Sequence, residues 1–113
     1  MDKKRENTFR HEKAIENIKR IAAEFLEMES NKTTLITVTN ASISKDLKKA
    51  TLYITVLPEE REMEALEFTR RRLSDFRDYV KTKMKFRNLP FFTMEIDKEG
   101  KILQKIDEIT KKK

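Results

Sequence analysis

Apolar residues return every three or four positions over two stretches near the ends of this chain, as they do on one face of a helix. The first stretch, Thr8–Met28, predicts a helix with Thr8 as its N-cap. The second, Ile102–Thr110, predicts a short helix with four apolar side chains turned inward: Ile102, Leu103, Ile106 and Ile109. Outside these limits we expect a flexible N-terminus over 1–7 and a charged tail over 111–113.

Three other stretches alternate apolar with polar or β-branched residues, which predicts half-buried strands. They are Thr33–Ser42, Lys49–Leu57 and Phe91–Asp97. The connector over 43–48 is short and polar, so the first two strands should be antiparallel neighbours. Gly100, the only glycine, follows the third strand and is expected to take a positive φ in a turn.

The stretch between the second and third strands predicts the longest helix, Pro58–Met84. Its apolar residues keep one face, and Pro58 suits the first helical position because no N–H is needed there. A single bend near Arg72–Ser74 and an uninterrupted helix are both open. With this helix the element order is α-β-β-α-β plus a small terminal helix, which predicts one α+β domain over 8–110 built as a two-layer sandwich with a three-stranded sheet.

Composition narrows the class of protein. The chain has 113 residues, 41% of them charged, a formal net charge of +6 and no cysteine. Disulfides and cysteine-based zinc sites are therefore excluded. The sequence has no long apolar run and no signal-peptide pattern, so we expect a cytoplasmic protein that neither spans a membrane nor is secreted by that route. A pI of about 9.5 favours an acidic partner.

The positive charge is concentrated in the second part of the long helix. Residues 70–90 hold eight basic and two acidic side chains, whereas residues 58–69 hold five acidic and one basic. Acids at the start and bases at the end of a helix also suit its dipole, so an ordinary solvated helix explains the sign of this gradient. The density of basic residues instead favours a surface that binds the phosphate groups of a polyanion. Candidate contacts are Arg70, Arg71, Arg72, Arg77, Lys81, Lys85 and Arg87, with a second patch of Lys45, Lys48 and Lys49.

Residues for catalysis are missing. The one histidine, His11, has no partner at a nucleophile or metal spacing, and a single glycine cannot form a phosphate-binding loop. Asp46 and Asp97 stand near strand ends, where capping and turn roles are common. We therefore predict no enzyme activity, no cofactor and no small-molecule substrate. Among the aromatic residues, Phe91 and Tyr79 are the ones expected off the core face, where they could stack on bases.

Several short motifs follow one another along the chain: Ser-Lys-Asp-Leu at 44–47, Lys-Lys-Ala at 48–50, Leu-Tyr-Ile-Thr-Val at 52–56, Phe-Arg at 76–77, Met-Lys-Phe-Arg-Asn-Leu-Pro at 84–90, then Phe92, Met94, Asp97 and Ile102-Leu103. In this order and spacing they resemble the ribosome-binding factor A family over about Thr8 to Ile109. The resemblance implies a type II KH-like fold without enzyme activity. It also implies binding to the free immature small ribosomal subunit through its rRNA, support of late maturation and 5′-end processing of 16S rRNA, and importance in the cold.

One departure concerns the long helix. KH domains usually hold backbone phosphates with a GxxG loop, which this chain lacks. The family has an interrupted helix there instead, marked by Ala-x-Gly, and the matching positions are Arg72, Leu73 and Ser74. Neither small residue is kept. Besides RNA binding, a monomeric interaction module whose basic face meets an acidic protein remains open, and Arg77 could simply pair with a nearby acid. We expect a monomer because no apolar stripe is left over.

Overall fold

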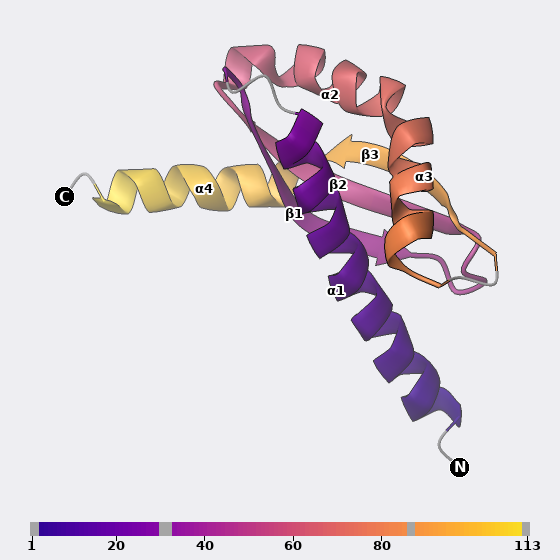
Figure 1. Ribbon diagram of the computed structural model, residues 1–113. Helices are drawn as coiled ribbons and strands as arrows, with labels where there is room; N and C mark the ends of the chain where they lie inside the picture. Colours follow the sequence, from indigo (N-terminus) through magenta and orange to yellow (C-terminus); the bar gives the residue numbers. More distant parts are fainter. Residues whose placement is uncertain (1–2, 30–32, 86–87, 112–113) are drawn as a thin grey trace.

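The computed structural model describes residues 3–29, 33–85 and 88–111, which form an α+β sandwich (Figure 1). The elements are α1 (Lys3–Glu29), β1 (Leu35–Ile43), β2 (Lys49–Leu57), the 3-10 turn η1 (Glu59–Arg61), α2 (Glu62–Arg71), α3 (Leu73–Lys83), β3 (Phe91–Ile96) and α4 (Lys98–Lys111). The expected order of helices and strands is confirmed. The predicted long helix is interrupted at Arg72, which separates α2 from α3.

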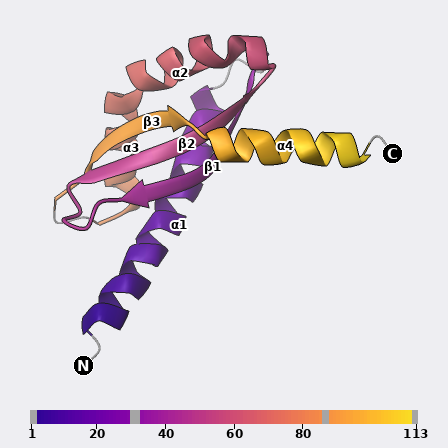
Figure 2. The same cartoon turned by 180° about the vertical axis from the view of Figure 1, so that it is seen from behind.

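The sheet has the order β1-β2-β3, with β1 antiparallel and β3 parallel to β2. Figure 1 shows α1 and α3 lying across one face, and Figure 2, from behind, shows the strands in front of α1. We call the face turned away from α1 and α3 the open face. This arrangement confirms the two-layer sandwich, since an amphipathic helix and a half-buried sheet bury their apolar sides against each other.

The core lies between the sheet and the helices and is centred on Phe76. This α3 side chain is fully buried, and its ring centroid lies 5.5 Å from that of Phe25 and 5.0 Å from that of Phe92. Phe25 comes from α1 and Phe92 from β3, so the three rings join both layers. On β2 the inward residues Leu52 and Ile54 are fully buried, as the alternation predicted.

A β-bulge changes the alternation in β1. The register with β2 shifts between Val38 and Asn40, which leaves Asn40 exposed and turns Ala41 into the core. Strict alternation along this strand predicts that Asn40 lies on the same face of the sheet as Ile36 and Val38. This prediction is wrong, because one extra residue in a strand turns every later side chain to the opposite face.

Helix α1 begins at Lys3, so Thr8 lies inside the helix and its expected role as an N-cap is wrong. The residues before Thr8 are mostly Lys, Arg and Glu, which have good helix propensity. His11, farther along α1, donates a hydrogen bond from Nε2 to the Ile43 carbonyl oxygen at 2.9 Å. This bond ties α1 to the end of β1.

Contrary to the prediction from its sequence, helix α4 does not pack on the core. Ile102, Leu103 and Ile106 are 60%, 66% and 54% exposed, because α4 leaves the end of the sheet and projects away from it (Figures 1 and 2). The predicted inward orientation is therefore wrong for these three residues, and the side chain of Ile109 lies outside the described part. These exposed apolar side chains remove the reason given above for a monomer.

The side chains of Lys101 and Asp97 hold the first turn of α4. Lys101 forms ion pairs with Glu59 at 2.7 Å and with Glu62 at 3.0 Å, and its hydrogen bonds to these carboxylates raise the pKa of Lys101.

Asp97 accepts hydrogen bonds from Thr39 Oγ1 at 2.5 Å and from the Gly100 N–H at 2.9 Å, so it is the N-cap, in agreement with its expected capping role. The expected positive φ at Gly100 is wrong. A Cβ there would lie 2.8 Å from Asp97 Oδ2, so a larger residue would displace the capping carboxylate.

Asp97→Ala should lower the free energy of unfolding by about 1 kcal/mol at neutral pH, because the first turn of α4 loses its cap. Hydrogen bonds from Thr39 and Gly100 lower the pKa of Asp97 below 3.8. The folded pKa is lower than the unfolded one, so this stabilisation is complete above about pH 4 and is lost as pH falls through the folded value. Urea unfolding at pH 7 and pH 3 measures both effects. Glu67→Ala, which removes an exposed carboxylate on α2, is the control, and an equal loss in both variants would contradict the capping role.

Candidate nucleic-acid interface

The junction between α2 and α3 is built around Arg72. Its backbone has φ −95° and ψ 5°, and its N–H is shared between the carbonyl oxygens of Phe68 at 3.2 Å and Thr69 at 3.1 Å. The next helix starts at once, with the Phe76 N–H donating to the Arg72 carbonyl oxygen at 2.9 Å. The two helices point in different directions as a result (Figure 1). An interrupted helix therefore forms here without the small residues that usually mark it.

The side chain of Arg72 holds this junction. Its guanidinium lies 2.6 Å from Glu29 at the end of α1 and 3.1 Å from Asp75 in the first turn of α3. The hydrogen bond to Glu29 raises the pKa of Arg72. Because both partners are carboxylates of the same chain, Arg72 is a structural residue of the junction and is poorly placed to meet phosphates.

Two more of the candidate arginines bind β3. Arg70 donates from Nε to the Met94 carbonyl oxygen at 3.3 Å and pairs with Glu95 at 3.4 Å. Arg77 donates from Nη1 to the carbonyl oxygen of Pro90, just before β3, at 3.0 Å, so its partner is a backbone oxygen and not the nearby acid of the alternative given above. Since β3 is at the edge of the sheet, these arginines satisfy carbonyl groups that have no neighbouring strand.

The lysines at the end of α3 are more open. Lys81 is 58% exposed and lies 3.9 Å from Asp78. An ion pair this long and this exposed adds little to the stability of the fold. Lys85 is exposed and makes no ion pair in the part of the chain that the structure describes. Lys83, which was not among the candidates, lies 5.4 Å from the centre of the Tyr79 ring. Its position in the basic run was the only signal for it in the sequence.

The connector between β1 and β2 presents the second patch. Asp46 accepts hydrogen bonds from Ser44 Oγ at 2.6 Å and from the Lys48 N–H at 3.0 Å, which lower the pKa of Asp46 and confirm its turn role. Leu47 takes the left-handed conformation with φ 61°. This tight turn leaves Lys45, Lys48 and Lys49 exposed.

The fold brings these two groups of lysines to one end of the sheet. The Phe91 N–H donates to the Lys48 carbonyl oxygen at 2.7 Å, so the connector touches the start of β3 just after α3. Both views show the β1–β2 and α3–β3 connections at the same end (Figures 1 and 2). We call this the basic end, formed by Lys45, Lys48, Lys49, Lys81, Lys83 and Lys85. Arg87, also a candidate, lies outside the described residues.

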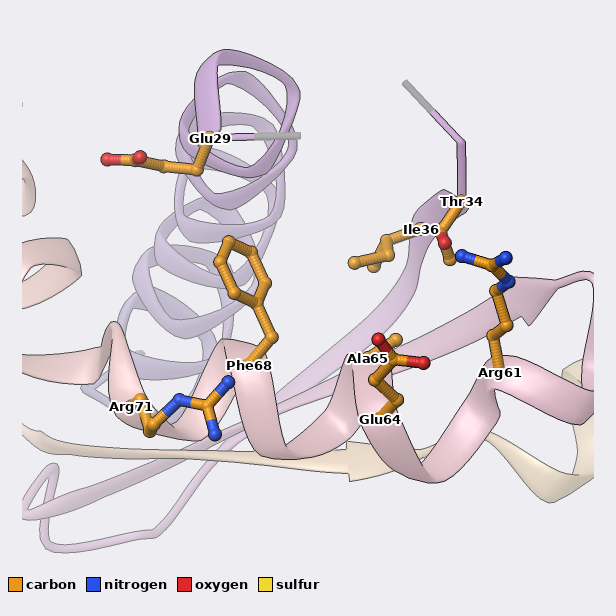
Figure 3. Close-up of a pocket in the computed structure, with 8 residues that line it drawn as sticks. All are labelled: Glu29, Thr34, Ile36, Arg61, Glu64, Ala65, Phe68 and Arg71. Atoms are coloured by element: carbon orange, nitrogen blue, oxygen red, sulfur yellow. The ribbon is translucent and has the colours of Figure 1, made fainter. Parts of the chain in front are cut away.

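A hollow of about 120 Å³ lies away from the basic end, between the end of α1, the start of β1 and α2 (Figure 3). Phe68, Ala65 and Ile36 give it an apolar surface. Arg61, Arg71, Glu29 and Glu64 are also among the residues that line it, so its charges are mixed. Arg71 is exposed, and it shares this mixed surrounding instead of lying among the lysines of the basic end.

Metal binding and membrane crossing are two alternatives to a charged partner. Within residues 3–29, 33–85 and 88–111, no group of three or more His, Asp or Glu side chains could hold a metal ion. Over those residues no helix is both long and apolar enough to cross a bilayer. Independently of these two findings, the six lysines of the basic end are all exposed and can meet a charged partner.

Comparisons with known proteins agree with one another. The family model for ribosome-binding factor A matches residues 10–110. A ribosome-binding factor A from Bdellovibrio bacteriovorus is 28% identical over 76 residues, which cover 66% of this chain and 57% of that protein. This chain therefore matches a little over half the length of that curated relative.

Solved structures show the same fold. The crystal structure of ribosome-binding factor A from Thermus thermophilus superposes with a TM-score of 0.68 at 22% identity, covering 76% of this chain and 93% of that one. A homology model of the Thermus thermophilus factor, fitted into a cryo-EM map of its 30S complex, has a TM-score of 0.63 at 23% identity and covers 71% of this chain and 87% of that one. These likenesses confirm the KH-like fold class.

Proposed function

Because the chain belongs to the ribosome-binding factor A family, we propose that it binds the free, immature small (30S) ribosomal subunit through rRNA and supports late maturation of that subunit, including 5′-end processing of 16S rRNA. The match of the family model over residues 10–110 carries this proposal. The fitted Thermus thermophilus factor, described as part of a 30S complex, supports the choice of subunit. The proposed role is one of binding, without catalysis, in the cytoplasm.

The basic end supports RNA as the direct partner. Its lysines come from α3 and from the β1–β2 connector, so they can meet phosphates on two sides of one RNA segment. Arg70, Arg72 and Arg77 contact Glu95, Glu29 and the Pro90 carbonyl oxygen, so they hold the helices beneath this surface, and RNA contact through them stays a prediction. RNA contact through Arg71 or Arg87 remains a prediction.

Density-gradient sedimentation of cell extract, with detection of this protein in each fraction, tests the proposal. We expect it to run with free small subunits, to be absent from translating ribosomes, and to leave the subunit at high salt because phosphate contacts are screened. Migration with the light proteins at low salt would contradict the proposal. Association that survives digestion of RNA would instead favour the basic face meeting an acidic protein.

The proposed role in 5′-end processing of 16S rRNA needs a separate measurement. In cells without this protein, 16S rRNA with an unprocessed 5′ end should accumulate, and primer extension measures the ratio of precursor to mature ends. Supplying the intact chain should restore the ratio. An unchanged ratio, with subunit binding intact, would limit the role to binding.

A further inference from the structure

Phe91 is a large aromatic side chain that the fold leaves in solvent. It is the first residue of β3 and is 65% exposed, whereas its neighbour Phe92 is 4% exposed and packs on Phe76. Strand alternation puts Phe92 in the core and Phe91 on the open face. Because most of the ring stays in contact with water, it contributes little to folding.

The surroundings of Phe91 are basic. Its partner in the register of β2 is Lys49, which is exposed and lies on the same face. The Lys48 carbonyl oxygen accepts the backbone N–H of Phe91 at 2.7 Å, which fixes the strand against the connector. The ring is therefore held at the basic end, beside lysines that have been proposed to meet phosphates.

The open face continues from Phe91 with groups suited to RNA. The next row across the sheet is Ser42, Thr51 and Thr93, and the Thr93 hydroxyl donates to that of Thr51 at 3.3 Å. One row farther, Tyr53 gives a second, half-buried aromatic ring, about 13 Å from Phe91 along the strands. Two rings at that separation can each take a different base, and hydroxyl groups between them can bond to riboses and base edges.

Glu95 is an acidic side chain on the same face, and an arginine balances its charge. Glu95 is the register partner of Tyr53 and pairs with Arg70 at 3.4 Å. Its repulsion of phosphates is therefore reduced, and the lysines next to Phe91 set the sign of the charge at that end of the face.

We propose that the open face of the sheet, centred on Phe91 with Lys49 beside it, is a stacking platform for the unpaired bases of single-stranded RNA. This inference rests on the proposed function, to which it adds the kind of RNA bound and the residues that bind it. Every base has a π face, so an exposed phenyl ring can hold bases of any sequence while neighbouring lysines follow the backbone. The platform lies across the sheet from α1 and α3, so it is separate from the helical face.

A single tryptophan can report on the platform directly, because the chain has none of its own. Phe91→Trp puts the indole on the open face, and stacking with a base should quench its fluorescence when single-stranded RNA of mixed sequence is added. A blunt RNA duplex of the same composition should quench it much less, since its bases are already paired. Met63→Trp is the matched control, because Met63 is 63% exposed on α2, away from the open face.

Affinity gives an independent test. Phe91→Ala should weaken binding of the same labelled single strand about tenfold in fluorescence anisotropy, and Phe91→Tyr should bind like the unchanged protein. Stacking involves no counterions, so Phe91→Ala should leave the slope of log K against log salt unchanged, whereas Lys49→Gln should reduce it by about 0.7.

The outcomes separate this inference from the proposed function. If Phe91→Trp is not quenched and Phe91→Ala binds RNA normally while the unchanged protein still sediments with small subunits, the platform is wrong and the proposed function stands. If Phe91→Ala loses the subunit but keeps its RNA affinity, the ring contacts a protein, and the platform is again wrong. Quenching with a loss of RNA affinity supports the platform, whether or not the unchanged protein sediments with subunits.

Discussion

Phe76→Ala should lower the free energy of unfolding by about 3–5 kcal/mol, the largest loss that we expect from any single substitution in this chain. The Phe76 ring is fully buried between Phe25 of α1 and Phe92 of β3. Removing it takes away apolar contacts to both layers and leaves a cavity that the rigid sheet cannot close. A domain of this size is usually stable by about 5–15 kcal/mol, so about 3–5 kcal/mol is a large share of the total.

Urea unfolding followed by circular dichroism measures this loss. Phe91→Ala is the matched control, because it removes the same group from a side chain that is 65% exposed, and its stability should change by less than about 1 kcal/mol. A loss below about 1 kcal/mol for Phe76→Ala would mean that Phe76 is not at the centre of the core.

Removing two charges from the basic end should weaken binding to the small subunit about 30-fold at 0.1 M salt. The variant is Lys48→Gln with Lys85→Gln, which takes one charge from the connector and one from the segment after α3. Each lost phosphate contact lowers the slope of log K against log salt by about 0.7–0.9, so this double variant should lower it by about 1.4–1.8. Neither lysine makes an ion pair within the described ranges, so folding should be little affected.

The control for this variant carries the same net charge. Arg61→Gln with Lys98→Gln also removes two exposed positive charges, but from η1 and the first residue of α4, away from the basic end. Binding measured by sedimentation with purified subunits at several salt concentrations should be nearly unchanged in the control. Equal losses in the two double variants would show that only net charge matters and that the basic end is not the contact surface.

The Arg70–Arg72 group shows why charge in a sequence does not by itself identify a binding site. All three side chains belong to a dense basic run, as Lys81 and Lys85 do. In the fold, Arg72 lies between Glu29 and Asp75, and Arg70 reaches around β3 to Glu95. Asp75 is only three residues from Arg72, but Glu29 and Glu95 are far from these arginines in sequence, so no local pattern could show the pairs with those two carboxylates.

Sequence periodicity determined the elements of this protein and the face that most of them bury. Alternation in β2 and helical spacing in α1 and α3 follow from local geometry, because side chains repeat every 2 residues in a strand and every 3.6 in a helix. Their place near strand ends, where aspartate is common, predicted capping or turn roles for Asp46 and Asp97. The family followed from short motifs in order, and the family model over residues 10–110 confirms it.

Only the tertiary structure decided what depends on contacts between distant segments. It broke the long helix at Arg72, a position with no glycine or proline, where an arginine is held by a carboxylate from α1. Helix α4 projects away from the core, although its apolar residues have the spacing of a packed helix. Spacing predicts which face of a helix is apolar, but not which surface covers that face. The tertiary structure also placed the connector lysines next to α3 and Phe91, because strand pairing, and not sequence distance, sets which residues are neighbours.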